Sequence, residues 1–269
     1  MVKHNERLER LRSVRLWLID LDGTIIRGGR ALPGADRLIQ TLRMTGRHFL
    51  ILTNNATRTP QTIARDLRDV GLLIEADEVY TSPQALVDLL LRQRPAAKVL
   101  AIGEAGLLEP LQRNDVHLVD HWREADTVCV GLDRGLCYEK LAQAALALQH
   151  GAHFYATNAD VRLPVEDGFH PGNGSIVRLL EAVSGQKAEV IGKPQPAMLE
   201  AALMRFGLTA KDALMLGDSL ETDMPAAAAL GMLGILVRTG VSHAATEEAL
   251  TGEKPLIFDD IPSLLPFIE

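Results

Sequence analysis

The sequence has few cysteines and no long hydrophobic run, which argues against export, a thiolate metal site and a membrane span. Among its 269 residues, Cys129 and Cys137 are the two cysteines, and no second pair or His cluster lies at the spacing of zinc ligands. We therefore expect two reduced thiols in a cytoplasmic protein, with a disulfide between them as the alternative. The longest apolar runs fall short of the roughly 18 residues that a membrane span needs, and residues 1–12 lack the apolar core of a secretion signal.

Acidic residues outnumber basic ones, with 35 Asp and Glu against 28 Lys and Arg. The net charge of −7 argues against nucleic acid as the main partner, because duplex binding normally needs a basic face. An anionic substrate would need local positive charge from a metal ion or from a particular Lys or Arg. With 47% hydrophobic and 23% charged residues the chain can fill a core, and its length allows one large α/β domain or two domains.

The stretch 14–24, VRLWLIDLDGT, is the first candidate site. Five of the six residues in 14–19 are apolar, which predicts a strand buried on both faces of a parallel sheet. Asp20 and Asp22 follow, and on extended backbone this spacing sends both side chains to the same side. Gly23 breaks the strand, which places the carboxylates at its carboxyl end, where open α/β sheets bind ligands. The alternative is a surface turn, because Asp and Gly are ordinary turn residues.

Strands and helices alternate along the whole chain, which is typical of a parallel α/β layer. The pattern predicts strands at 14–19, 48–52, 98–102, 126–130, 153–156, 189–191, 213–216 and 234–237. It predicts helices at 35–45, 60–70, 85–92, 104–113, 138–150, 195–206 and 222–230. These are too many strands for one simple sheet, so we expect two α/β domains, the second inserted into the first.

Two further strand ends carry polar residues suited to a phosphate. Thr53 and Asn54 follow the strand 48–52 and offer neutral hydrogen-bond donors; loop capping is their alternative role. Lys193 follows the strand 189–191 between a Gly and a Pro, so its ammonium could be a fixed point charge. The alternative for Lys193 is a solvated surface side chain.

A fourth strand end is rich in acids. The strand 213–216 is followed by GDSLETD, which contains Asp218 and Asp223. These acids could be no more than helix-start chemistry, because Asp favours caps and the positive end of the helix dipole. However, Asp218 follows a buried strand directly, as Asp20 does. If the two converge, they form an oxygen-rich site for a hard divalent cation, and Mg²⁺ fits better than zinc because no His or Cys accompanies them.

The order DLDGT, LTNN, GKPQP, GDSLETD resembles the four signature motifs of the haloacid dehalogenase (HAD) superfamily of aspartyl-phosphate hydrolases, over residues 14 to 240. The segments LTNNATRTP, CVGLD, ATNAD and GFHPGNGSI are similar to its NagD-like branch, whose members carry a large α/β cap before GKPQP. The resemblance implies a Rossmann-like parallel-sheet core domain formed by residues 1–81 and 183–269. A smaller α/β cap domain, residues 82–182, would be inserted into it.

The resemblance also implies an activity, the Mg²⁺-dependent hydrolysis of small organic phosphate monoesters. Asp20 would be the nucleophile, and Asp22 the general acid and base. An acid at position 22 favours a phosphatase, since ion-pumping relatives have Thr there. Mg²⁺ would be held by Asp20, by the backbone carbonyl of Asp22 and by Asp218.

The other motif residues would bind the phosphoryl group or support its binding. The resemblance implies that Thr53, Asn54 and Lys193 bind the phosphoryl oxygens. It implies that Asp223 orients either Lys193 or a metal-bound water. Two rival functions share the fold: a phosphotransferase or phosphomutase that uses the same intermediate, and a non-catalytic phosphate-binding regulator.

The cap of this branch would close over the site and supply specificity residues, here expected at Asn158, Asp160 and the loop 167–174. Two positions depart from the pattern, Ala159 where Pro is usual and Glu221 where Asp is usual, and they bear on cap-loop shape and substrate preference. The expected partner is a small-molecule phosphate ester, with no nucleic acid and no membrane. A homodimer through the caps has precedent in the family.

Overall fold

The computed structural model describes residues 2–165, 167–242 and 254–268. The chain forms two compact units, each assembled from separate stretches of sequence. The first unit contains Met1–Thr53, Pro60–Tyr80 and Lys193–Glu269, and the second contains Asn54–Thr59 and Thr81–Gly192. The chain therefore passes between the units at four places, two of which adjoin Thr53 and Lys193.

The first unit is built on a six-stranded sheet in the order β15-β14-β13-β1-β4-β5. Its strands are β1 (Leu16–Asp20), β4 (His48–Thr53), β5 (Val79–Thr81), β13 (Ala213–Gly217), β14 (Leu233–Val237) and β15 (Leu256–Phe258). The pairs of β1 with β4 and β13, of β13 with β14, and of β14 with β15 are parallel. All five residues of β1 are buried, as the continuous apolar run predicts, and the expected α/β fold with a parallel-sheet core is confirmed.

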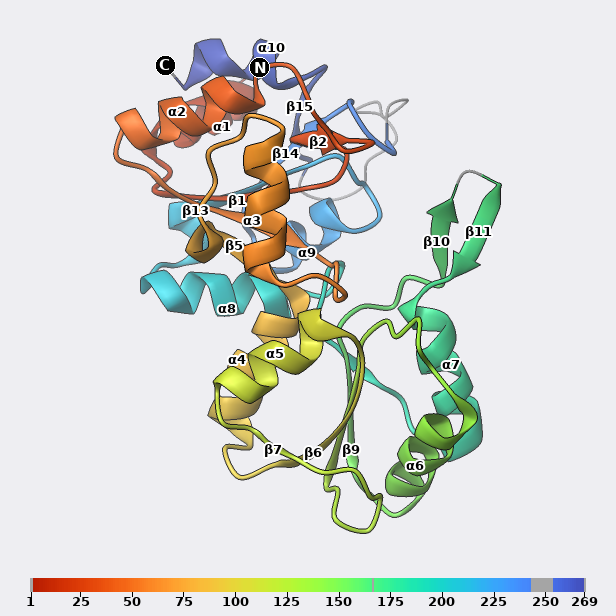
Figure 1. The fold of residues 1–269 in the computed structure, drawn as a ribbon. Coiled ribbons are helices and arrows are strands. Elements are labelled where there is room, and N and C mark those ends of the chain that lie inside the picture. Colours follow the sequence, from red (N-terminus) through yellow and green to blue (C-terminus); the bar gives the residue numbers. More distant parts are fainter. Residues whose placement is uncertain (1, 166, 243–253, 269) are drawn as a thin grey trace. The chain divides into compact units, whose positions relative to one another are not determined.

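Helices and short elements complete the first unit (Figure 1). They are α1 (Val2–Ser13), α2 (Ala35–Met44), α3 (Pro60–Asp69), α8 (Ala197–Phe206), α9 (Asp223–Ala229) and α10 (Ile261–Leu264), with the 3₁₀ turns η1 (Ala76–Glu78), η2 (Ala210–Asp212) and η4 (Leu265–Phe267), and the two-residue strands β2 (Ile26–Arg27) and β3 (Arg30–Ala31). Helix α2 buries Leu38, Ile39 and Leu42, one apolar face at helical spacing, against the core that contains Trp17.

The second unit has a five-stranded sheet of its own, in the order β12-β9-β8-β6-β7, with parallel pairing. Its strands are β6 (Lys98–Ile102), β7 (His117–Leu118), β8 (Thr127–Val130), β9 (His153–Ala156) and β12 (Glu189–Val190). Figure 1 shows α4 (Ser82–Gln93) and α5 (Ala105–Arg113) on one side of this sheet, and α6 (Tyr138–Gln149) and α7 (Asn173–Ser184) on the other. An antiparallel hairpin, β10 (Arg162–Val165) and β11 (Gly168–Pro171), extends from the unit.

One strand pairs in a different sheet from the one that the domain bounds taken from the family resemblance imply. The segment 189–191 was expected in the core domain, whose second part was set at 183–269, but β12 pairs with β9 in the sheet of the second unit. The first unit resumes at Lys193, and the second unit runs to Gly192 rather than to 182. Lys193 thus does not follow a strand of the core sheet. The pattern found the strand but could not assign it to a sheet, because a two-residue strand carries no alternation that favours one sheet or the other.

Both cysteines are free: Cys129 is buried in β8 and Cys137 is exposed, so the alternative of a disulfide is wrong. Within the described residues, every helix is too short or too polar to cross a membrane.

Candidate active site

The sheet register aligns the predicted strand ends. Ile19 of β1 pairs with Leu216 of β13, and Asp20 pairs with Leu52 of β4. Thr53 and Asp218 therefore lie one residue beyond the level of Asp20 on the two neighbouring strands. Parallel pairing thus places these three side chains at one edge of the sheet, the carboxyl edge where α/β proteins bind ligands.

Lys193 lies among the carboxylates of this edge. Its Nζ donates to Oδ1 of Asp20 and, at 2.6 Å, to Oδ1 of Asp223, the first residue of α9. Only 3% of the Lys193 side chain is exposed, which excludes the alternative of a solvated surface lysine. The second oxygen of Asp223 accepts the Ser219 N–H at 3.1 Å, so both of its oxygens are engaged.

Asp218 is held in a tight backbone cradle. Its Oδ2 accepts the Val241 N–H at 2.7 Å. A Cβ added to Gly23 or to Gly240 would overlap the Asp218 carboxylate, so both backbones approach it as only glycine allows. Gly23 also has a φ of 87°, which disfavours any other residue there. The loop after β14 is fixed in turn, because the Thr239 hydroxyl donates to the Gly23 carbonyl at 2.6 Å.

The two aspartates of the DLD stretch occupy different environments. Strand β1 ends at Asp20, which is buried and accepts the Thr24 hydroxyl at 3.4 Å, whereas Asp22 lies past the strand and is exposed. The strand alternation that would send both side chains to one side therefore does not reach Asp22. This difference gives one buried carboxylate and one that solvent can reach.

Burial governs the electrostatics of the cluster. It raises the pKa of Asp20 well above the ordinary value, which Lys193 opposes and Asp223 reinforces. It also raises the pKa of Asp218, against the opposing hydrogen bond from Val241. Burial alone would lower the pKa of Lys193, but the carboxylates of Asp20 and Asp223 outweigh it and raise that pKa, so the lysine remains an ammonium.

The donor set of this cluster fits a hard divalent cation. One carboxylate oxygen from each of Asp20, Asp218 and Asp223 can be chosen so that all lie within 4.8 Å of one another. When ionised, three carboxylates face the single ammonium of Lys193, which leaves two negative charges without compensation. An all-oxygen, buried and negatively charged site is the environment that Mg²⁺ prefers over zinc.

The segment after β4 divides between the units. Thr53 is buried at the end of β4 in the first unit, whereas Asn54 belongs to the second. The next residue, Asn55, caps this loop, because its Oδ1 accepts the N–H groups of Thr57 and Arg58 at 3.0 and 3.1 Å.

The two residues expected to set specificity, Asn158 and Asp160, differ in burial. Asn158 is buried, and its Nδ2 donates to the Asn54 carbonyl at 2.9 Å while its Oδ1 accepts the Asp160 N–H at 3.2 Å. Its amide is thus committed to contacts within the second unit. Asp160 is exposed.

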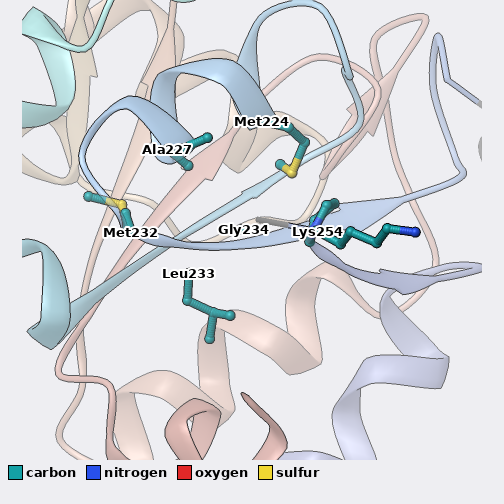
Figure 2. A pocket seen from close by; sticks show the side chains of 8 residues that line it. Met224, Ala227, Met232, Leu233, Gly234 and Lys254 are labelled. Carbon is teal, nitrogen blue, oxygen red and sulfur yellow. The ribbon is translucent and has the colours of Figure 1, made fainter. Parts of the chain in front are cut away.

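A small pocket in the first unit is a different place from the aspartate cluster (Figure 2). Met224 and Ala227 of α9 and Met232, Leu233 and Gly234 on β14 or just before it line the pocket, with Lys254 at its side. None of the predicted site residues lines it, and its side chains are mostly apolar. The pocket therefore has no part in the chemistry proposed below.

Sequence reasoning missed the loop 239–242, which supplies the Val241 N–H and the Gly240 backbone to Asp218. The available signal was the Thr239-Gly240 pair, which follows the buried strand 234–237 after one residue, Arg238. It also missed the role of Thr24, whose hydroxyl donates to the Asp20 carboxylate.

Comparisons with known proteins identify the family of this chain. A haloacid dehalogenase-like hydrolase model matches residues 17–117, and a HAD-hydrolase-like model matches residues 190–264. The 5'-nucleotidase YutF of Bacillus subtilis is 35% identical over 261 residues, which cover 96% of this chain and 100% of that protein. The acid sugar phosphatase of Staphylococcus aureus is 38% identical over 238 residues, covering 86% of this chain and 89% of the relative.

Solved structures are similar over nearly the whole chain. A 4-nitrophenylphosphatase from Thermotoga maritima superimposes with a TM-score of 0.89 at 29% identity, covering 97% of this chain and 99% of that one. NagD from Escherichia coli has a TM-score of 0.87 at 28% identity, covering 93% and 97% of the two chains.

Proposed function

Because the chain belongs to the haloacid dehalogenase-like hydrolases, as a NagD-like member, we propose that it hydrolyses small organic phosphate monoesters through a phosphoryl group carried on Asp20. The relatives named for an activity are phosphatases or nucleotidases, and the chain is accordingly a phosphoric monoester hydrolase. The observation that carries the mechanism is the buried Asp20 carboxylate at the carboxyl end of β1, bonded to the ammonium of Lys193.

Two displacements at phosphorus account for the reaction. In the first, a carboxylate oxygen of Asp20 attacks the phosphorus in line, the bond to the leaving oxygen breaks, and Asp22 protonates that oxygen to release the alcohol. In the second, Asp22 takes a proton from water, whose oxygen attacks the same phosphorus and regenerates Asp20 with release of phosphate. The exposed position of Asp22 supports this role, since it must exchange protons with substrate and water; such catalysis is worth about 10² to 10⁴ in rate.

Lys193, Thr53 and Asn54 would bind the phosphoryl oxygens as negative charge spreads over them in the transition state. Lys193 suits this task because its two carboxylate contacts hold the ammonium in one place and keep it charged. Asp223 would act through Lys193, since its Oδ1 fixes that ammonium at 2.6 Å.

The proposed metal is Mg²⁺, with Asp20, Asp218 and the backbone carbonyl of Asp22 as its protein ligands. When bound, the ion would offset the negative charge of the carboxylates and allow an anionic substrate to approach Asp20. The donor set described above supports this choice because it contains oxygen alone.

The substrate class is a small organic phosphate ester, as for the relatives named for nucleotides, sugar phosphates and nitrophenyl phosphate. We assign the second unit to the cap of this branch, with Asp160 and the loop 167–174 as its specificity residues. The proposal includes a cytoplasmic location, which two free thiols favour, and a homodimer that a mass measurement in solution would test.

The test is phosphate release from p-nitrophenyl phosphate in the presence of Mg²⁺. Asp20→Asn should abolish turnover, and Asp22→Asn should slow it by about 10² to 10⁴. Asp259→Asn is the control, because Asp259 is an exposed acid paired with Arg238 on the surface. Full activity of Asp20→Asn would exclude this nucleophile. Added alcohols that compete with water for the phosphoryl group would instead indicate a phosphotransferase, and absence of turnover a phosphate-binding regulator.

A further inference from the structure

Two chain crossings between the units adjoin the proposed phosphate-binding residues. Asn54 directly follows Thr53, and Gly192 directly precedes Lys193. Both Asn54 and Gly192 are held by one dipeptide of the second unit: Asn158 Nδ2 donates to the Asn54 carbonyl at 2.9 Å, and the Gly192 N–H donates to the Thr157 carbonyl at 2.9 Å. A single point therefore ties together two segments that are far apart in sequence.

The two tied segments are also in close contact with each other. A Cβ added to Gly192 would lie 2.5 Å from Asn54 Oδ1 and 2.5 Å from the Thr157 carbonyl oxygen, so Gly192 has no room for a side chain. The Asn54 carbonyl receives a second bond from the Ser82 hydroxyl at 3.2 Å. The peptide plane after Asn54 is thus fixed from two sides by buried donors.

A second layer holds Asn158 in place. Asn173 is 1% exposed, and its Nδ2 donates to the Asn158 carbonyl at 2.8 Å. The glycines on either side of Asn173, at 172 and 174, approach the backbone of 159–160 so closely that a Cβ on either would overlap a carbonyl oxygen. The ATNAD and GNGS segments thus interlock through backbone contacts and one buried amide.

We infer that Asn158 is a positioning residue that, through the Asn54 carbonyl and with Asn173 behind it, sets the placement of the segments carrying Thr53, Asn54 and Lys193. The inference rests on the proposed function, since those residues are its phosphate ligands. A buried amide-to-carbonyl bond suits this task because it is stronger in a low dielectric than in water, so its loss costs more free energy. A displacement of about 1 Å at a reacting centre can cost about 10² in rate.

The test compares Asn158→Asp with Gln186→Glu. Each change turns an amide into a carboxylate and removes a donor to a backbone carbonyl of the second unit, since Gln186 Nε2 donates to the Leu148 carbonyl at 2.6 Å. Gln186 bonds Leu148 and, through its backbone N–H, Ser184, which both lie away from the two crossings in sequence, so it is the matched control. The readouts are kcat and KM for p-nitrophenyl phosphate, the inhibition constant of inorganic phosphate, and the melting temperature.

We expect Asn158→Asp to lower kcat by about tenfold to a hundredfold and to weaken inhibition by phosphate, while Gln186→Glu keeps both within about twofold at a similar melting temperature. Ser82→Ala removes another donor to the Asn54 carbonyl and should also lower kcat and weaken phosphate inhibition, but by less than Asn158→Asp. This variant replaces Asn158→Asp in the test if Asn158→Asp does not fold.

If folded Asn158→Asp shows the kcat and the phosphate inhibition of the wild type, the inference is overturned. The same result in Ser82→Ala overturns it where Asn158→Asp does not fold. In either case, phosphate release by the wild type would still support the proposed function. A wild-type protein that releases no phosphate would overturn the proposed function itself, and the two failures are therefore distinct.

Discussion

The ammonium of Lys193 lies 2.6 Å from a carboxylate oxygen of Asp223, and the two side chains are 3% and 1% exposed. The same ammonium bonds Asp20, so one buried cation is shared between the proposed nucleophile and a carboxylate on the first turn of α9. Removing the ammonium leaves the carboxylates uncompensated in a low dielectric, and removing the carboxylates leaves the ammonium uncompensated there.

Lys193→Met should therefore cost both stability and activity. It leaves three buried carboxylates facing one another, and breaking a buried pair typically costs about 3–5 kcal/mol in the free energy of unfolding. Lys187→Met is the control, since that lysine is 86% exposed in its pair with Glu181 and should change stability by about 0–1 kcal/mol. Urea unfolding of both variants measures the difference, and equal losses would contradict the buried pair described here.

Mg²⁺ should stabilise the protein against heat because the ion binds the folded carboxylate cluster and not the unfolded chain. At a concentration 100 times its dissociation constant, a ligand adds about 2.7 kcal/mol to the free energy of unfolding. Asp218→Asn removes one proposed ligand and should abolish most of this shift, whereas Asp259→Asn should keep it. A melting curve recorded with EDTA and with Mg²⁺ tests the site without any substrate, and equal shifts in both variants would exclude Asp218 as a ligand.

Gly240→Ala should inactivate the enzyme while Gly234→Ala should not. A Cβ at Gly240 would overlap the Asp218 carboxylate, which is itself fixed by the Val241 N–H, so either the carboxylate or the loop must move. A Cβ at Gly234 would lie 2.9 Å from the sulfur of Met224, a flexible side chain beside the small pocket in Figure 2. Phosphate release should fall by about 10² in the first variant alone; comparable activity in both would argue against the cradle.

Stability should fall in acid through Glu104. Its side chain accepts the Arg134 Nε at 2.8 Å and Nη2 at 2.6 Å, and these hydrogen bonds hold its pKa below the ordinary value. The folded pKa lies below the unfolded one, so this stabilisation is complete above the unfolded pKa, near 4.3, and disappears as the pH falls through the folded pKa. The stability gap between wild type and Glu104→Gln should therefore narrow from pH 6 to pH 3; a gap that is constant over this range contradicts the assignment.

The core sheet was predictable because its strands are buried on both faces. Continuous apolar runs identify β1, β4 and β13, and the small polar residues that end them locate Asp20, Thr53 and Asp218. Where apolar residues repeat along one helix face, the predicted helix bounds are accurate to about one residue. The helix expected at 104–113, for example, is observed as Ala105–Arg113. The antiparallel hairpin β10–β11 was missed because β11 is exposed throughout and shows no burial pattern.

The partners of the site residues were harder to predict than the residues themselves. The contact of Lys193 with Asp223, which the family resemblance implied and no local pattern did, joins positions 30 residues apart, and that of Lys193 with Asp20 joins positions 173 apart. Such distances depend on packing that no local pattern encodes. Asn158 was expected among the specificity residues because its motif lies in the cap, yet its burial and its bond to Asn54 commit its side chain to the backbone.

The membership of β12 in the second sheet bears on chimeric proteins built from this chain and a relative. Exchanging residues 82–182 as a cassette would split the exchanged unit, because β12 and its pairing with β9 would then come from different parents. A cassette that ends after Gly192 keeps that pairing intact. It must also take residues 54–59 from the same parent, because the donor to the Asn54 carbonyl is Asn158 of the cassette. A transplant of the second unit of this chain is therefore a two-segment exchange.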